Sequence, residues 1–95
     1  MSLEYTVFMA PGENQCFAAV AENIIQNIPE AKMSDDSHSL WLPGEYSHWI
    51  DFSIEKSDDG FFIVTNMNGS SNKSLFQLIE TVLNRLSVGY SIEEV

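Results

Sequence analysis

The sequence predicts an α+β fold, in which a mostly antiparallel sheet carries two helices on one face. Three observations support this prediction: a strand–turn–strand pattern at the centre of the chain, a strand pattern at its N-terminus, and two segments with apolar residues at helical spacing. The predicted order is β-α-β-β-β-α. Each helix has one apolar stripe to bury, so both are expected to pack on the same side of the sheet. A chain of 95 residues predicts a single α+β domain over residues 1–95.

A β-hairpin over residues 48–66 is the centre of this fold. Its first run, WIDFSIE at 49–55, alternates apolar and polar side chains, which is typical of a strand with one buried face. Its second run, FFIVT at 61–65, is rich in strand-forming residues and apolar at every position but the last. The sequence SDDG at 57–60 supplies turn residues between the two runs.

The N-terminal third predicts one strand and one helix. Alternation from Leu3 to Met9 predicts the strand, and Pro11-Gly12 ends it. A helix is expected from about Glu13 to Ile28, because apolar residues recur at steps of three and four, and Pro29 stops it. The residues of this apolar face are Phe17, Val20, Ala21, Ile24 and Ile28.

The segments that flank the hairpin are less regular. Residues 30–39 read as a polar connector, and 40–42 as a short apolar strand at a sheet edge, which Pro43-Gly44 breaks. Residues 67–71 read as a loop. A second helix is expected from about Lys73 to Val88, on the apolar residues Leu75, Leu78, Ile79, Val82, Leu83 and Leu86.

The ends of the second helix carry capping signals. Ser74 and Gln77 match a capping box, with Ser71 or Asn72 as alternative caps. Gly89 is expected to be the left-handed residue after the helix. The tail, 90–95, is either frayed or a last short strand.

Composition and charge limit the classes of function. The single cysteine, Cys16, excludes an internal disulfide, and no export signal or membrane span is recognised, so we expect a cytoplasmic protein. The net charge is −10, and residues 30–59 hold eight acids against Lys32 and Lys56. This sign disfavours direct binding to nucleic acid or to anionic membranes and favours a basic protein partner. The alternative, that the charge only keeps the protein soluble, stays open.

No catalytic, metal or cofactor motif is present, so we do not expect an enzyme. Cys16 lies in the first turns of a predicted helix, and His38 or His48 would be the base for it, but the surrounding residues match no nucleophile signature. The two histidines and their acidic neighbours match no metal-ligand spacing. The sequential pairs Asp35-Asp36 and Asp58-Asp59 are typical of turns rather than of a catalytic dyad.

Large aromatic residues among the acids of the middle third indicate a protein interface. Trp41, Tyr46 and Trp49 lie within nine residues, and aromatic anchors beside charge are typical of interface hot spots. We expect the uncovered sheet face to carry Trp49, Asp51, Ser53 and Glu55. An alternative is that the two tryptophans seal the sheet edge or a second small core. The predicted partner-binding residues are Asp35, Asp36, Tyr46, Trp49, Asp51, Glu55, Asp58 and Asp59.

In its size, its acidic charge and its mixed α/β pattern, the chain resembles the immunity proteins of bacterial toxin systems, of the contact-dependent inhibition or colicin type. The resemblance implies a small acidic inhibitor, monomeric or homodimeric, that binds and neutralises a basic toxin such as a nuclease. Its acids would pair with lysines and arginines of the toxin, with Tyr46 and Trp49 as anchors. Two alternatives remain: a small-molecule-binding or regulatory α/β domain with a pocket between sheet and helices, and a homo-oligomeric subunit that uses the open sheet face.

Overall fold

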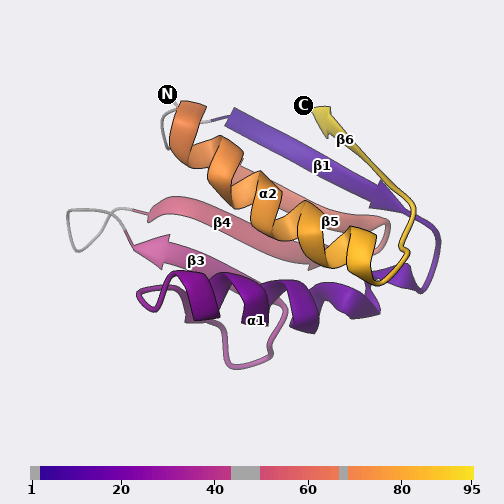
Figure 1. Cartoon of the computed structure of the whole chain (residues 1–95), viewed down its shortest axis with the longest axis horizontal. Helices are drawn as coiled ribbons and strands as arrows, with labels where there is room; N and C mark the ends of the chain where they lie inside the picture. The colour runs from indigo at the N-terminus through magenta and orange to yellow at the C-terminus, as the bar shows by residue number, and fades with distance from the viewer. Residues whose placement is uncertain (1–2, 44–49, 67–68) are drawn as a thin grey trace.

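The computed structural model describes residues 3–43, 50–66 and 69–95, and it confirms the α+β class with two helices on one face of an antiparallel sheet (Figure 1). The elements, in chain order, are β1 (Leu3–Met9), the 3-10 helix η1 (Glu13–Cys16), α1 (Phe17–Asn27), β2 (Lys32–Met33), β3 (Ser39–Pro43), β4 (Ile50–Ser57), β5 (Gly60–Thr65), α2 (Gly69–Arg85) and β6 (Tyr90–Glu94).

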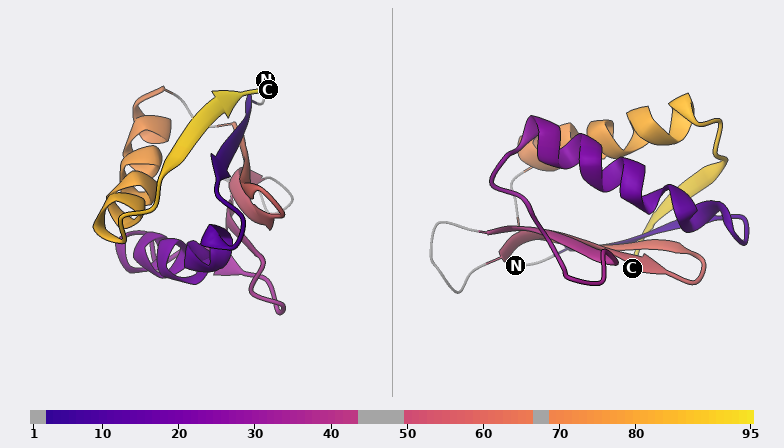
Figure 2. Two further views of the ribbon diagram at one scale, coloured as in Figure 1. Left: turned by 90° about the vertical axis from the view of Figure 1, so that its right-hand side faces the viewer. Right: turned by 90° about the horizontal axis from the view of Figure 1, so that it is seen from below.

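The strands form one sheet in the order β2-β3-β4-β5-β1-β6, and every neighbouring pair is antiparallel. The N-terminal strand β1 lies between β5 and β6, so segments far apart in sequence meet in the sheet. Figure 2 shows the two helices as a separate layer above the sheet. None of the helices described in the structure has the length and apolar character needed to span a membrane.

The core lies between the sheet and the helix layer. Alternate strand residues point into it, such as Phe52 and Ile54 of β4, and both are fully buried. Most of the helix residues predicted from their spacing are buried: Phe17, Val20, Ala21 and Ile24 of α1, and Leu75, Ile79, Val82 and Leu83 of α2. Ile28 and Leu78 are only half-buried. The prediction was wrong for Leu86, which follows the end of α2 and is 47% exposed. The one-sided stripe of each helix therefore matches the one-sided burial of the strands.

Both helices differ from the predicted bounds. The first begins with the turn of 3-10 helix η1, and its α-helical part runs only from Phe17 to Asn27. The second begins earlier, at Gly69, so Asn72 and Ser74 lie inside it rather than at its cap. Asn72 is buried, and its side-chain oxygen accepts a hydrogen bond from the hydroxyl of Thr65, which is also buried. The hydrogen bond between Asn72 and Thr65 therefore joins α2 to the end of β5.

The C-terminal end of α2 also differs from the prediction. Ser87, with a φ of 59°, takes the left-handed conformation that was expected at Gly89. The N–H of Val88 donates to the carbonyl of Leu83 at 2.9 Å, and the N–H of Ser87 donates to that of Asn84 at 3.1 Å. These are the two hydrogen bonds of a Schellman motif. Val88 is buried, so the chain has to turn before this residue rather than after it.

Two short strands complete the sheet. The connector predicted at 30–39 contains β2, whose two residues pair with Trp41 and Leu40 of β3. The edge position predicted for residues 40–42 is therefore wrong, because β3 is paired on both sides and β2 forms that edge of the sheet. The tail forms β6, which pairs with β1 from Met9 to Tyr5. The second of the two possibilities for the tail, a last short strand, is therefore the correct one.

Gly60, at the start of β5, is fixed by a close approach of two backbones. Its φ is +146°, and a Cβ built at this position would lie 1.9 Å from the carbonyl oxygen of Val7. A side chain at residue 60 would therefore collide with β1, the strand on the other side of β5 from β4. Glycine lets the turn at Asp58 and Asp59 lead straight into the pairing of β5 with β1.

We expect Gly60→Ala to lower the free energy of unfolding by more than about 2 kcal/mol, since the backbone conformation and the neighbouring backbone both oppose a Cβ. Gly89→Ala is the matched control. A Cβ added at Gly89 would have no other atom within 4 Å, and this glycine does not have a positive φ. The substitution should therefore change the free energy of unfolding by less than about 1 kcal/mol. Denaturant unfolding of both variants measures this, and equal small effects would contradict the explanation.

Candidate protein-binding surface

The face of the sheet that points away from α1 and α2, which we call the open face, follows from the strand alternation. Phe52, Ile54, Ile63 and Val7 are fully buried beneath the helices, so their sequence neighbours point the other way. The open face is made of Glu4, Thr6 and Phe8 of β1, Phe62 and Val64 of β5, Asp51, Ser53, Glu55 and Ser57 of β4, Ser39 and Trp41 of β3, Lys32 of β2, and Ser91 and Glu93 of β6.

Acidic side chains outnumber basic ones on the open face. Asp51 and Glu55 of β4 lie there, where the alternation in the sequence predicts them, and the face also holds Glu4 and Glu93. Among the described residues of the open face, one is basic: Lys32, on the edge strand β2. A face with this excess of carboxylates attracts cationic groups and repels phosphates.

The two predicted aspartate pairs lie in neighbouring turns at one end of the sheet. Asp58 and Asp59 form the turn between β4 and β5. Asp35 and Asp36 lie in the turn between β2 and β3, and the N–H of Lys56 donates to the carbonyl of His38 in that turn at 2.7 Å. Glu55 pairs with Ser39, the first residue after the same turn. The structure thus brings Glu55 and both pairs to one edge of the open face.

Asp36 has a structural part in its turn. Its carboxylate accepts hydrogen bonds from the hydroxyl of Ser34 at 2.6 Å and from the N–H of His38 at 3.0 Å. These hydrogen bonds, the one from Ser34 first, lower the pKa of Asp36. Ser34 also accepts from the N–H of Ser39, so the serine connects the carboxylate to the start of β3.

The aromatic residues of the candidate site are only partly described. Tyr46 and Trp49 lie outside the described residues. Trp41 lies on the open face of β3, is half-buried, and pairs with Ser53 on one side and Lys32 on the other.

Three apolar residues of the open face were not predicted from the sequence: Phe8, Phe62 and Val64. The second strand of the hairpin is apolar almost throughout, so its own pattern does not show which residues face the helices. The pairing of Ser57 with Gly60 across the turn supplies that information. It places Phe62 opposite Glu55 and Val64 opposite Ser53.

The other candidate chemistry of the sequence does not assemble into a site. Cys16 is half-buried, and this burial is the main reason why the pKa of its thiol is raised, with a further contribution from the nearby charge of Glu13. A raised pKa disfavours the thiolate that a nucleophile needs. His38 is exposed in the β2–β3 turn, 3.9 Å from a carboxylate oxygen of Asp36. Among residues 3–43, 50–66 and 69–95, no three histidine, cysteine or acidic side chains are grouped so as to hold a metal ion.

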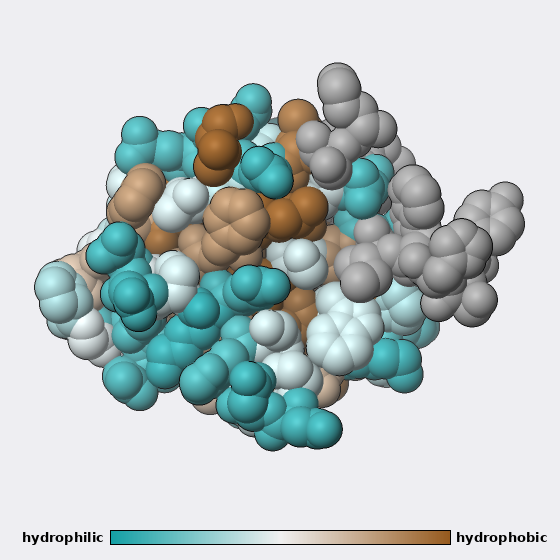
Figure 3. All heavy atoms as spheres, turned by 180° about the vertical axis from the view of Figure 1, so that it is seen from behind, coloured by the Kyte–Doolittle hydropathy of each residue, from teal (hydrophilic) through white to brown (hydrophobic). Residues whose placement is uncertain are grey.

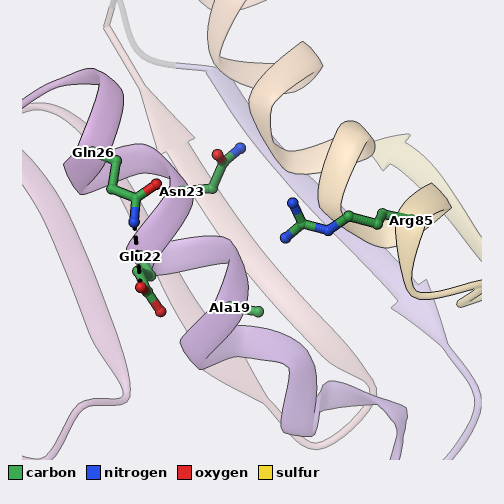
Figure 4. A pocket seen from close by; sticks show the side chains of 5 residues that line it. All are labelled: Ala19, Glu22, Asn23, Gln26 and Arg85. Carbon is green, nitrogen blue, oxygen red and sulfur yellow. Dashed lines mark hydrogen bonds between the residues drawn. The ribbon is translucent and has the colours of Figure 1, made fainter.

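A shallow pocket of about 210 Å³ lies between the two helices (Figure 4). Its walls are Ala19, Glu22, Asn23 and Gln26 of α1, with the side chain of Arg85 reaching toward them from α2. Gln26 donates a hydrogen bond to Glu22 at 3.3 Å, and Asn23 donates to the carbonyl of Leu78 at 3.0 Å. The pocket is polar and smaller than the 300–1,000 Å³ typical of ligand sites, and it differs from the apolar pocket between sheet and helices that a small-molecule-binding domain needs.

Comparison of the chain with protein-family models, with curated proteins and with solved structures finds no match.

We expect Ser34→Ala to raise the pKa of Asp36 toward its ordinary value of about 3.9, because the strongest hydrogen bond to the carboxylate is lost. Because the pKa of Asp36 is lower in the folded than in the unfolded native protein, the ionised carboxylate stabilises the fold above about pH 4. This stabilisation is lost as the pH falls through the pKa of Asp36 in the folded state. The variant should therefore lose less stability on acidification than the native chain.

A carbon NMR titration of the Asp36 carboxyl group, with acid unfolding curves for both proteins, measures these effects. Ser91→Ala, an exposed serine on β6, is the control and should leave the titration of Asp36 unchanged. An unaltered titration in Ser34→Ala would contradict the assigned role of the serine.

Proposed function

We propose that this protein is a small acidic inhibitor that binds a basic protein toxin and neutralises it, as an immunity protein does. The observation that carries the proposal is the gathering of carboxylates on and beside the open face: Asp51 and Glu55 on the face, and Asp35, Asp36, Asp58 and Asp59 at its end. A toxin that acts on nucleic acid needs basic residues at its active site, and an acidic surface is complementary to them.

The rigidity of the acidic surface supports the same proposal. Asp51 and Glu55 belong to β4, an inner strand that is paired on both sides, and the aspartate turns connect adjacent strands of the same sheet. Side chains on such a scaffold lose less conformational freedom on binding than side chains on a free loop. An inhibitor benefits from this preorganisation because its task is to remain bound.

The proposal is tested first by genetics in the source strain. The gene is deleted alone and, separately, together with its immediate upstream neighbour. We expect the single deletion to kill the cells or to sensitise them to their siblings, and the double deletion to grow until siblings attack it. Normal growth of both deletion strains among wild-type siblings would refute the inhibitor function.

Charge should control the rate at which the complex with that neighbouring gene product forms. We expect the association rate constant to fall steeply between low and physiological salt, and the double variant Asp51→Asn/Glu55→Gln to lower it roughly tenfold at low salt. Stopped-flow fluorescence measures both effects. Glu22→Gln, an exposed acid on the helix layer, is the matched control and should change the rate by less than about twofold. An association rate that does not vary with salt would contradict the electrostatic part.

A further inference from the structure

Four apolar side chains form a diagonal band across the open face, which we call the apolar strip: Phe8, Phe62, Val64 and Trp41. Phe62 and Val64 are successive open-face residues of β5, and Thr6, opposite Phe62, is followed two positions later by Phe8. On the other side, Val64 pairs with Ser53, and Ser53 pairs with Trp41. The strip thus extends over β1, β5 and β3, with one small serine between Val64 and Trp41.

The strip is in contact with solvent. Phe8 is 40% exposed, and the other three side chains are half-buried. Figure 3 looks directly at this face and shows hydrophobic atoms gathered over its middle, with hydrophilic side chains beside and below them. Aromatic residues are costly to leave in water, and monomeric proteins rarely expose them as a continuous patch.

The acids around the strip limit what can cover it. Glu4 pairs with Val64, Glu55 pairs with Phe62, and Glu93 pairs with Thr6. In a two-fold symmetric dimer through this face, both copies would bring the same excess of carboxylates to the interface, and their mutual repulsion opposes association. A partner with basic side chains around an apolar centre would instead pair with every one of them.

The size of the face is sufficient for a stable complex. The molecule measures 36 × 26 × 21 Å, and the sheet lies approximately in the plane of the two longer dimensions, as Figure 1 shows. A face on this scale is comparable with the roughly 800 Å² that each protein contributes to a standard interface. Phe62 and Val64 of the strip lie on the inner strand β5, near the middle of the face, where residues that carry most of the binding energy are usually found.

The geometry points to the apolar strip as the centre of the protein's interface, with a basic protein as its occupant: one that presents an apolar patch surrounded by lysine or arginine side chains. This inference rests on the proposed function for the identity of the partner, and it names the surface and the chemistry that hold the partner in place. Acids at the end of the sheet attract the partner, and the strip supplies the desolvated contact.

The first test is photo-crosslinking in the source cells. The photoreactive p-benzoyl-phenylalanine is introduced in place of Phe8, in place of Phe62 and, as a control, in place of Leu86, which is 47% exposed on the helix side of the molecule. We expect the two sheet positions, and not the control, to capture the same protein, with a sequence pI above about 9. Capture of a second copy of this chain, of acidic proteins, or of no protein at Phe8 and Phe62 would overturn the inference.

This test separates failure of the surface from failure of the proposed function. Sheet-specific capture of a basic protein, together with harmless gene deletions, would leave the interface in place and refute toxin inhibition. Deletions with the expected toxicity, together with capture only from Leu86, would leave the inhibitor function in place and overturn the role of the strip.

The second test measures the dissociation rate of the captured protein. We expect Phe62→Thr to raise it at least about tenfold, because an aromatic contact at the centre of the interface is lost. Leu86→Thr should change it by less than about twofold. Val64→Thr is a second variant that should also raise the dissociation rate. It keeps the shape of the side chain and therefore carries little risk to the fold. Thermal unfolding confirms that each variant is folded, and unchanged dissociation for both Phe62→Thr and Val64→Thr would overturn the inference.

Discussion

The register of the β4–β5 hairpin is the constraint on which the rest of the structure depends. Side chains alternate between the two faces of a strand, so a slip of one residue would move Phe52, Ile54 and Ile63 out of the core. The turn at Asp58 and Asp59 sets this register on one side of β5. On the other side, Gly60 sets it, because β1 approaches so closely that no side chain fits there. The turn and the glycine together therefore fix the register of three strands, and with it the composition of both faces of the sheet.

The unequal covering of the sheet is a consequence of this arrangement. Each helix has a single apolar stripe, and both stripes are used on the same face. The register nevertheless places Phe8, Phe62 and Val64 on the other face, where threonine, a polar residue that also favours strands, would be compatible with the sheet. An α+β domain with one wet sheet face normally carries polar residues there. The apolar residues of that face are not needed to fill the core, which is why we assign them a binding role.

Local patterns in the sequence were sufficient for the hairpin, for both helices and for the placement of Asp51 and Glu55. They were not sufficient where tertiary packing decides. Ser87 is left-handed because Val88 has to enter the core, and β6 exists because β1 leaves an edge to which it can pair. The candidate site shows the same limit. Phe62 could not be assigned to a face from an unbroken apolar run, although counting from the turn across the hairpin would have assigned it.

The charges and the apolar strip would contribute to different steps of complex formation. Carboxylates in the exposed turns, such as Asp58 and Asp59, remain largely hydrated, so a pairing with lysine or arginine there adds little to the lifetime of a complex. Their field acts over about a Debye length and therefore mainly speeds and orients the encounter. Phe62 and Val64 act only on contact, when water leaves the strip, and therefore mainly slow dissociation. An inhibitor of the kind proposed would need both a fast encounter and a slow dissociation, and acids beside an apolar strip would favour each of them.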